Sequence, residues 1–530
     1  MLVNIITYIY KQMSDLIDYN YVDRIVKLYV SELSTQDIKM DISIFREAML
    51  HNSARKRKTY DRLEFLGDAV YHIVISEYIF IRYDDENEGF LTKLRIRLER
   101  GESMTDLSYI LLLDRYVQLN NFQLNDHIME DLFEAFIGAF FLNFGMKYVR
   151  MLIISLIEQH KDVAEMIVHD DNYKDLLLRY FHQLKWGHPK YEETYIDNKY
   201  VSIVRNPDGQ IIGKGASRIK RTAEQLASKS VLEKMKIIVD DKVDPNWMDH
   251  IEKIEKVKKI DKKTLPVHNS QNKLLSEKII FKMLNDCNIV VTRGTKLKLR
   301  RFNEAMTHRS YLSRTKKTTD KKIPVDKLCV PLQKKSNCRL QFLGGAVLHF
   351  VVAYMLFKKY DVEDEGFLTR LRSKLENKEV LFYLAQQTDI ASYVMVSQNI
   401  EMLHGRNNIN IIGGGFEAFI AALYLEMGLK VANDFVLTTY ETNYDIDAIA
   451  LDETNHKEVI YHYFNRKGWS HPVYQLIKES GPDHNKTFEI ALCRPNSDDI
   501  WTTGTGSSKR KAEQNASKQA YQEIQERNQK

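Results

Sequence analysis

Between residues 61 and 70, apolar and charged positions recur with the period of a helix. Leu63, Phe65 and Leu66 fall toward one side, which predicts a helix that packs that side into a core. A charged stripe opposite such a side is most often a solvated helix face, so the stripe alone does not indicate chemistry. The stripe here consists of Asp61, Glu64 and Asp68.

A second predicted helix, around 131–138, changes this interpretation. Asp131 and Glu134 lie at helical spacing in an otherwise apolar run, where unpaired carboxylates are costly. Between the two acidic segments, Glu88 stands at the head of another predicted helix. Carboxylates that converge on an apolar scaffold are suited to a hard cation such as Mg²⁺.

Three segments together resemble the ribonuclease III family. Asp61–Val70 resembles its nuclease signature E-R-L-E-F-L-G-D, Asp131–Gly138 its second metal-binding helix, and Ala48–Ser53 its A-x-x-H-x-S element. The resemblance implies an all-helical nuclease domain that uses Mg²⁺, with Mn²⁺ as an alternative ion, to cut double-stranded RNA into 5′-phosphate and 3′-hydroxyl ends. The catalytic, metal-binding residues that it implies are Glu64, Asp68, Asp131 and Glu134. The accessory residues are Glu88 and Asp61, which stands where the family usually has glutamate.

The second half of the chain repeats these motifs without their acids. Arg339–Val347 repeats the apolar pattern of the signature, Glu365–Arg372 repeats the segment that begins at Glu88, and Gly414–Ile420 repeats the second metal-binding helix. Of the four essential carboxylates only the counterpart of Glu134 remains. We therefore predict that the second nuclease-like domain is inactive, because one carboxylate cannot hold and orient Mg²⁺. The three substituted essential positions are Gln341, Gly345 and Gly414, the retained carboxylate is Glu417, and Cys338 replaces the accessory Asp61.

A smaller module of helix, three strands and helix is predicted after each nuclease-like domain. The second module, to about Glu526, resembles a double-stranded RNA-binding domain because it contains Gly468–Tyr474, Gly481–His484 and Gly504–Gln514 in order. Basic side chains at the start of its last helix would add to the helix dipole against phosphates. The resemblance implies RNA contacts by His484, Lys509, Arg510 and Lys511.

The first module is a weaker match to the same family. Its exit cluster contains Lys220 and Arg221, the predicted RNA contacts, but two extra residues separate this cluster from the preceding glycines. Its loop between the first two strands is short and lacks a Gly-Pro-x-His run. This module is interpreted equally well as a weak RNA binder or as a packing element.

These boundaries predict a multidomain α plus α+β protein in which two all-helical domains are each followed by an α-β-β-β-α module. Residues 1–165 form the active nuclease domain, 170–236 the divergent module, 237–269 a charged linker with one helix near 248–259, 270–445 the inactive domain and 452–527 the second module. Residues 314–336 form a Lys-rich insertion that is either a solvated loop or an RNA contact.

Composition indicates which cellular compartment and which kinds of partner to expect. The 530 residues carry a net charge of only +5, which suits an acidic metal site balanced by basic RNA surfaces. Four scattered cysteines lack metal-ligand or disulfide spacing, which indicates a reducing intracellular compartment, cytoplasm or nucleus. The first 11 residues are too short to span a bilayer and lack signal-peptide features, so neither secretion nor a membrane partner is expected.

Two functions follow from the motifs. The favoured one is a Mg²⁺-dependent endoribonuclease that processes double-stranded or hairpin RNA, and the alternative is a non-catalytic protein that sequesters duplexes. In the ribonuclease III family two nuclease domains pair about a two-fold axis. The two halves of this chain are therefore expected to form an internal pseudo-dimer, with a homodimer through the first halves as the rival arrangement.

Overall fold

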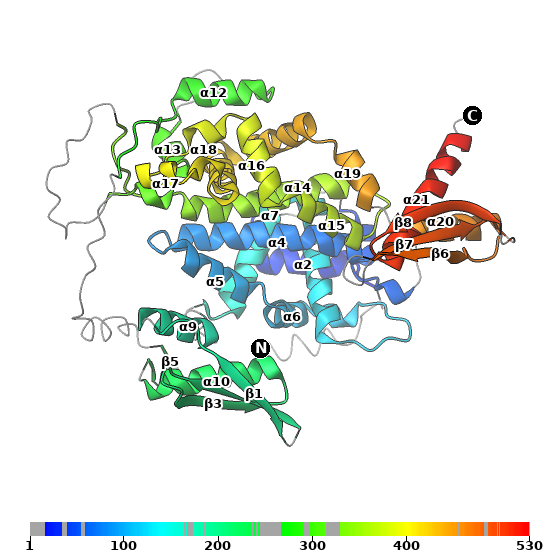
Figure 1. Ribbon diagram of the computed structural model, residues 1–530, viewed down its shortest axis with the longest axis horizontal. Coiled ribbons are helices and arrows are strands. Elements are labelled where there is room, and N and C mark those ends of the chain that lie inside the picture. The colour runs from blue at the N-terminus through cyan, green and yellow to red at the C-terminus, as the bar shows by residue number, and fades with distance from the viewer. Residues whose placement is uncertain are drawn as a thin grey trace.

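The computed structural model contains two similar helical domains in one central body and two small α/β modules (Figure 1). One module lies below the helical body in that view and the other at its right-hand end. The structure describes the whole chain except residues 1–15, 34–39, 55–58, 164–165, 167–172, 185, 197, 236, 240–241, 244–266, 291–296, 314–328, 454–455, 482–485, 496, 498 and 529–530.

The first helical domain is built around two long helices, α4 (Asp61–Arg82) and α7 (Asp126–His160). A short polar side chain starts α7: Asn125 accepts a hydrogen bond from the backbone N–H of Ile128, which satisfies a donor that the helix cannot. Gly145 interrupts α7 with a left-handed φ of 79°, a conformation that glycine adopts without steric cost. The other helices are α2 (Tyr19–Tyr29), α3 (Ile42–Glu47), η2 (Asn52–Ala54), α5 (Glu88–Leu98), α6 (Gly101–Ile110) and η3 (Leu113–Arg115).

The second helical domain repeats the main helices of the first. Helices α14 (Cys338–Lys359) and α4 both have 22 residues, and α18 (Ile409–Asn443) and α7 both have 35. Even the interruption is repeated, at Gly428 with φ of 85°. The other helices are α12 (Glu277–Asp286), α13 (Leu299–Ala305), η4 (Arg309–Tyr311), α15 (Glu365–Leu375), α16 (Lys378–Gln387), η5 (Ile390–Tyr393), α17 (Gln398–Met402), η6 (Gly405–Asn407) and α19 (Ile446–Glu453).

The long helices of each domain cross in backbone contact. A methyl group on Gly67 of α4 would overlap the carbonyl oxygen of Glu134 in α7, and one on Gly138 would overlap the carbonyl oxygen of Leu63. Gly344 of α14 meets the carbonyl oxygen of Glu417 in the same way. This close approach brings the acidic faces of α4 and α7 together.

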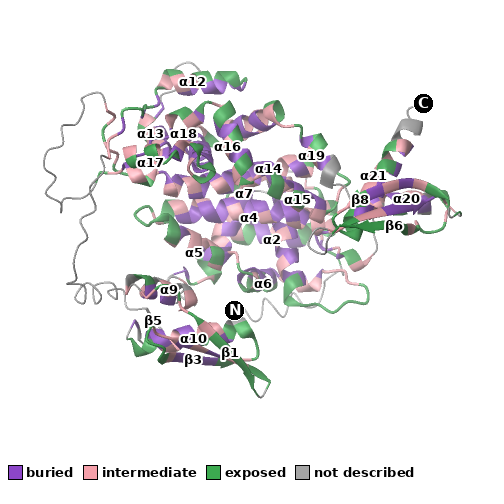
Figure 2. Cartoon of the chain, in the orientation of Figure 1, coloured by how far each residue is buried: buried purple, intermediate pink, exposed green. Residues whose placement is uncertain are grey.

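The two helical domains pack through α4 and α14 and share one continuous hydrophobic core (Figure 2). Arg62 donates hydrogen bonds to the carbonyl oxygens of Phe357, Tyr360 and Glu363 at the end of α14. Its counterpart Arg339 donates to those of Phe80, Tyr83 and Glu86 at the end of α4. The two arginines satisfy carbonyl groups that each helix end leaves unpaired.

By length and composition, α7, α14 and α18 are apolar enough to cross a membrane. In this fold all three helices contribute residues to the shared core, and 44% of the apolar stretch of α7, 67% of that of α14 and 72% of that of α18 is buried.

Each α/β module is a three-stranded antiparallel sheet covered by two helices. The first contains α9 (Tyr173–Gln183), β1 (Tyr191–Ile196), β2 (Lys199–Arg205), β3 (Ile211–Ser217) and α10 (Lys220–Lys234), followed by a two-stranded hairpin, β4 (Ile238–Val239) and β5 (Lys242–Val243). The second contains α20 (His456–Lys467), β6 (Tyr474–Ser480), β7 (Thr487–Cys493), β8 (Ile500–Gly506) and α21 (Lys509–Asn528).

The predicted helical domains and three-stranded sheets are thus confirmed. The exact domain boundaries stay a prediction. The apolar start of the chain, the helix near 248–259 and most of the Lys-rich insertion lie outside the described residues.

Two neighbouring glycines of α14 test the close helix crossing. Gly344→Ala should lower the free energy of unfolding by about 1–3 kcal/mol, the usual cost of overpacking, because its methyl group would overlap a backbone carbonyl. Gly345→Ala is the matched control, since its methyl would lie 3.8 Å from Oε1 of Glu417. It should leave the stability unchanged or raise it by up to about 1 kcal/mol. Urea unfolding followed by circular dichroism gives both values, and equal losses would contradict the crossing.

Candidate active site

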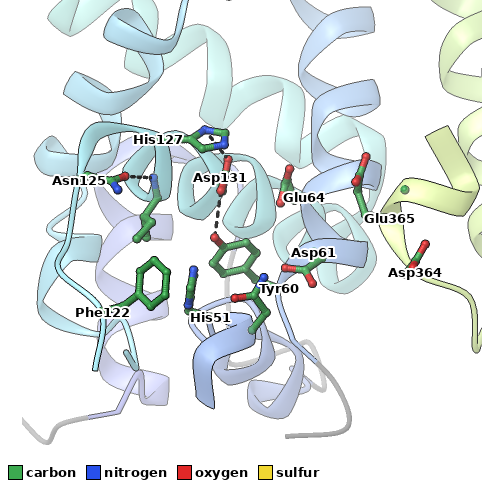
Figure 3. A pocket seen from close by; sticks show the side chains of 13 residues that line it. His51, Tyr60, Asp61, Glu64, Phe122, Asn125, His127, Asp131, Asp364 and Glu365 are labelled. Carbon is green, nitrogen blue, oxygen red and sulfur yellow. Dashed lines mark hydrogen bonds and ion pairs between the residues drawn. The ribbon is translucent and has the colours of Figure 1, made fainter. Parts of the chain in front are cut away.

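A cavity of about 500 Å³ opens where α4, α7 and the start of α15 meet (Figure 3). Glu64, Asp131 and Glu365 all lie on its wall, and Glu365 comes from the second half of the chain. The cavity is therefore completed by both helical domains. Its other lining residues are His51, Asn52, Tyr60, Asp61, Phe122, Asn125, His127, Ile128, Asp364 and Gly366.

Two of the predicted metal ligands face this cavity. Asp131 accepts a hydrogen bond of 2.9 Å from the hydroxyl of Tyr60 through Oδ2, and Nδ1 of His127 lies 3.3 Å from its Oδ1. Burial raises the pKa of Glu64 to about 9, with further contributions from the negative charges of Asp131 and Glu365. Burial also raises the pKa of Asp131. Both carboxylates are thus crowded by like charge in a poorly solvated site.

The other two predicted ligands, Asp68 and Glu134, lie outside the cavity lining on the facing sides of α4 and α7. Burial, followed by the charges of Asp68 and Glu64, raises the pKa of Glu134 well above its ordinary value. Asp68 differs from the other three. Its Oδ2 lies 3.3 Å from Nη1 of Arg372 and 3.6 Å from Nε2 of His349, both in the second half of the chain. Burial alone would raise its pKa, but His349 and Arg372 outweigh burial and lower it to about 2.

The donor set fits a hard divalent cation. Four carboxylates supply only oxygen atoms, as Mg²⁺ requires, and three of them have pKa values raised by burial and mutual repulsion. A bound cation would relieve that repulsion. Among the described residues, no three His, Cys, Asp or Glu side chains stand close enough together to hold a metal ion as they are. A bound cation would have to draw the carboxylates closer together, while the contacts of Asp131 with Tyr60 and of Asp68 with Arg372 each use Oδ2 of the aspartate.

The two predicted accessory acids are separated. Asp61 lines the cavity, and its Oδ2 accepts a hydrogen bond of 3.0 Å from Thr59. Glu88 is exposed at the start of α5 and is not among the lining residues. Glu365, its counterpart in the second half, lines the cavity instead. The motif analysis missed Glu365 and Asp364. The internal repeat could have identified them, because two-fold pairing carries each copy of this segment across to the other domain.

The equivalent centre of the second domain is neutralised by a lysine. Nζ of Lys378 lies 2.7 and 2.8 Å from the two carboxylate oxygens of Glu417, and Gln341 donates a hydrogen bond of 3.0 Å to the same group. The first domain has Gly101 at the position of Lys378. An internal ammonium group therefore balances the single carboxylate that remains.

The predicted RNA-binding residues differ in their surroundings. Lys509, Arg510 and Lys511 are exposed at the start of α21. At the start of α10, Nζ of Lys220 lies 2.6 Å from Oε2 of Glu193, so its charge is already paired. Arg221 belongs to α10, but its side chain, like the whole of His484, lies outside the described residues.

Comparison with known proteins matches every one of these parts. Residues 61–145 match the family described as "Ribonuclease III domain", and residues 300–443 the family "Ribonuclease-III-like". Residues 173–235 and 456–524 both match the "Double-stranded RNA binding motif".

The relatives extend the match along the chain. A "Probable ribonuclease 3" of Acanthamoeba polyphaga mimivirus is 52% identical over 531 residues, which cover 97% of this chain and 98% of that protein. A ribonuclease 3 of a Nitratiruptor species is 36% identical over 230 residues, which cover 43% of this chain and 91% of that protein. Among solved structures, the nuclease domain of ribonuclease III from Campylobacter jejuni is 25% identical with a TM-score of 0.25, and the match covers 31% of this chain and 98% of that one.

The mimivirus relative matches both helical domains and both α/β modules in one alignment, and the shorter bacterial relative matches less than half of the chain. The family matches assign the helical domains to nucleases and the modules to double-stranded RNA binding. The chain therefore belongs to the ribonuclease III family of endoribonucleases.

Proposed function

We propose that this chain is a Mg²⁺-dependent endonuclease that hydrolyses double-stranded RNA at one active centre and leaves 5′-phosphate and 3′-hydroxyl ends. The observation that carries the proposal is the group of four carboxylates at the crossing of α4 and α7. Three of them have raised pKa values because burial and mutual repulsion disfavour their charged forms. Such a group is stable as anions only beside a cation, so the site is suited to binding one.

In this mechanism Glu64, Asp68, Asp131 and Glu134 would hold Mg²⁺. The bound ion supplies the positive charge that activates water and stabilises the leaving oxygen. Tyr60 orients Asp131 through its hydroxyl group. The cavity of about 500 Å³ leaves room for a phosphodiester beside Glu64 and Asp131.

Differences between the two halves favour internal pairing over a homodimer. Across the interface, the hydroxyl of Tyr424 donates a hydrogen bond of 2.7 Å to Glu77, and Arg150 donates one of 2.8 Å to that hydroxyl. In the internal repeat Phe141 stands at the position of Tyr424 and packs edge-on against Tyr354, which stands at the position of Glu77. A homodimer of first halves would bring Phe141 against Glu77, so a partly buried carboxylate would lose a hydrogen-bond donor. The interface surface of the first half therefore fits the second half better than it would fit a second copy of the first half.

The state of the cysteines supports a reducing compartment as the cellular location of the protein. The four described cysteines, Cys287, Cys329, Cys338 and Cys493, are not joined in disulfides, and two of them are buried. We therefore propose that the protein is located in a reducing compartment, the cytoplasm or nucleus.

The catalytic assignment is tested by paired amide substitutions. Glu134→Gln or Asp68→Asn should reduce Mg²⁺-dependent cleavage of a labelled duplex to the protein-free background, because each removes a proposed metal ligand. Duplex binding should be retained, since both residues lie away from the α/β modules. Glu417→Gln is the matched control from the inactive centre and should leave cleavage intact. A Glu134→Gln variant that cleaves normally would contradict the proposed site.

The division of RNA binding between the modules is tested by removing their cations. Replacing Lys509, Arg510 and Lys511 by alanine should weaken duplex binding more than replacing Lys220 and Arg221, because Lys220 is already paired with Glu193. The slope of log affinity against log salt should fall by about 0.9 for each phosphate that the variant no longer neutralises. Binding measured at several salt concentrations gives both quantities. Equal losses of affinity from the two sets of substitutions would show that both modules contribute equally to duplex binding.

A single centre predicts the order of strand cuts. Early in the reaction on a long duplex, denaturing gels should show nicks before native gels show double-strand breaks, in a protein that sediments as a monomer. Cutting the second strand, and so completing a double-strand break, would require a second binding event in the opposite orientation. Concerted, staggered breaks by a dimeric species would instead support pairing of two first domains.

A further inference from the structure

Two arginines, one from each half, make matching ring contacts across the interface between the halves. Arg372 stacks over the ring of Phe65 at 4.8 Å, and its counterpart Arg95 stacks over Phe342 at 5.0 Å. The two arginine side chains are similarly buried, 13% and 19% exposed. They therefore make matched contributions to the interface.

Each arginine has a neighbouring histidine, and the two arginine–histidine pairs differ in the side chains that they contact. On one side, Arg372 and His349 both contact Oδ2 of Asp68. On the other side Gly345 replaces the aspartate, and Nη1 of Arg95 instead lies 3.3 Å from Nε2 of His72. Each histidine also has a glutamate at 3.0 Å from its Nδ1, Glu376 for His349 and Glu99 for His72. Only Arg372 and His349 thus contact a proposed metal ligand directly, while His72 packs against the ring of His349 with the ring centres 4.8 Å apart.

We infer that Arg372 and His349 are positioning residues through which the inactive half orients Asp68 for metal binding, an inference that rests on the proposed function. Both contacts are made with Oδ2, so Oδ1 remains available as a ligand atom. Glu376 anchors the ring of His349 from its far side. Groups that hydrogen-bond a ligating carboxylate fix its orientation and strengthen metal binding. The inactive half would then be required for the active centre itself, beyond its packing role.

The mirror arginine provides the control. Arg372→Gln should weaken Mn²⁺ binding to the RNA-free full chain about 10–100-fold, the usual effect of losing such a partner, and should raise the Mg²⁺ concentration for half-maximal cleavage by a similar factor. Arg95→Gln removes the same ring contact without touching a ligand, so it should change both quantities by less than about twofold. Isothermal titration with MnCl₂ measures metal binding directly, with Asp68→Asn as the baseline. Thermal melting should show similar destabilisation in the two glutamine variants.

Further variants keep the inference testable if Arg372→Gln folds poorly. Arg372→Lys keeps the charge and should recover part of the Mn²⁺ affinity. His349→Gln should also weaken Mn²⁺ binding. Equal Mn²⁺ affinities of the Arg372→Gln and Arg95→Gln variants would overturn the inference. If instead Asp68→Asn and Glu134→Gln both bind Mn²⁺ and cleave normally, the proposed active site itself fails.

Discussion

The close crossing of two long helices is the constraint on which the site depends. Because Gly67 and Gly138 carry no side chain, α4 and α7 touch backbone to backbone, and the carboxylates on their facing sides are brought together. This proximity has a cost, since burial and like charge raise the pKa values of Glu64, Asp131 and Glu134. A bound cation would remove most of that cost. The packing that stabilises the domain and the electrostatics that favour metal binding thus arise from the same contact.

The second domain keeps this crossing but has lost the need for a cation. Gly344 still meets the backbone of Glu417, so the helices retain their packing. Three carboxylates have been replaced, and Lys378 neutralises the one that remains. A single ion pair at a partly exposed position contributes little to stability, but a carboxylate left there without a partner would be unfavourable. The centre of the second domain therefore balances its own charge with a lysine in place of a bound cation.

Pairing of the domains has consequences that neither half shows alone. Reciprocal arginines cap the ends of α4 and α14, and the same geometry carries Glu365 into the cavity and Arg372 to Asp68. The second half is then both a packing partner and a source of side chains for the site. The RNA-binding modules are attached outside this core, with exposed cations at the start of α21 and a paired one at the start of α10.

The sequence by itself determined the elements and most of the candidate site. Helical period predicted the acidic helices, because it depends on local backbone geometry. The resemblance to the ribonuclease III family implied the helical nuclease domains and the joint role of Glu64 and Asp131. Only the tertiary structure decided which copy of each repeated segment enters the cavity. It brought Glu365 rather than Glu88 to the lining and set His349 and Arg372 beside Asp68. Such contacts join residues that lie about 300 positions apart, and local periodicity holds no information about them. They follow from the two-fold packing of the halves.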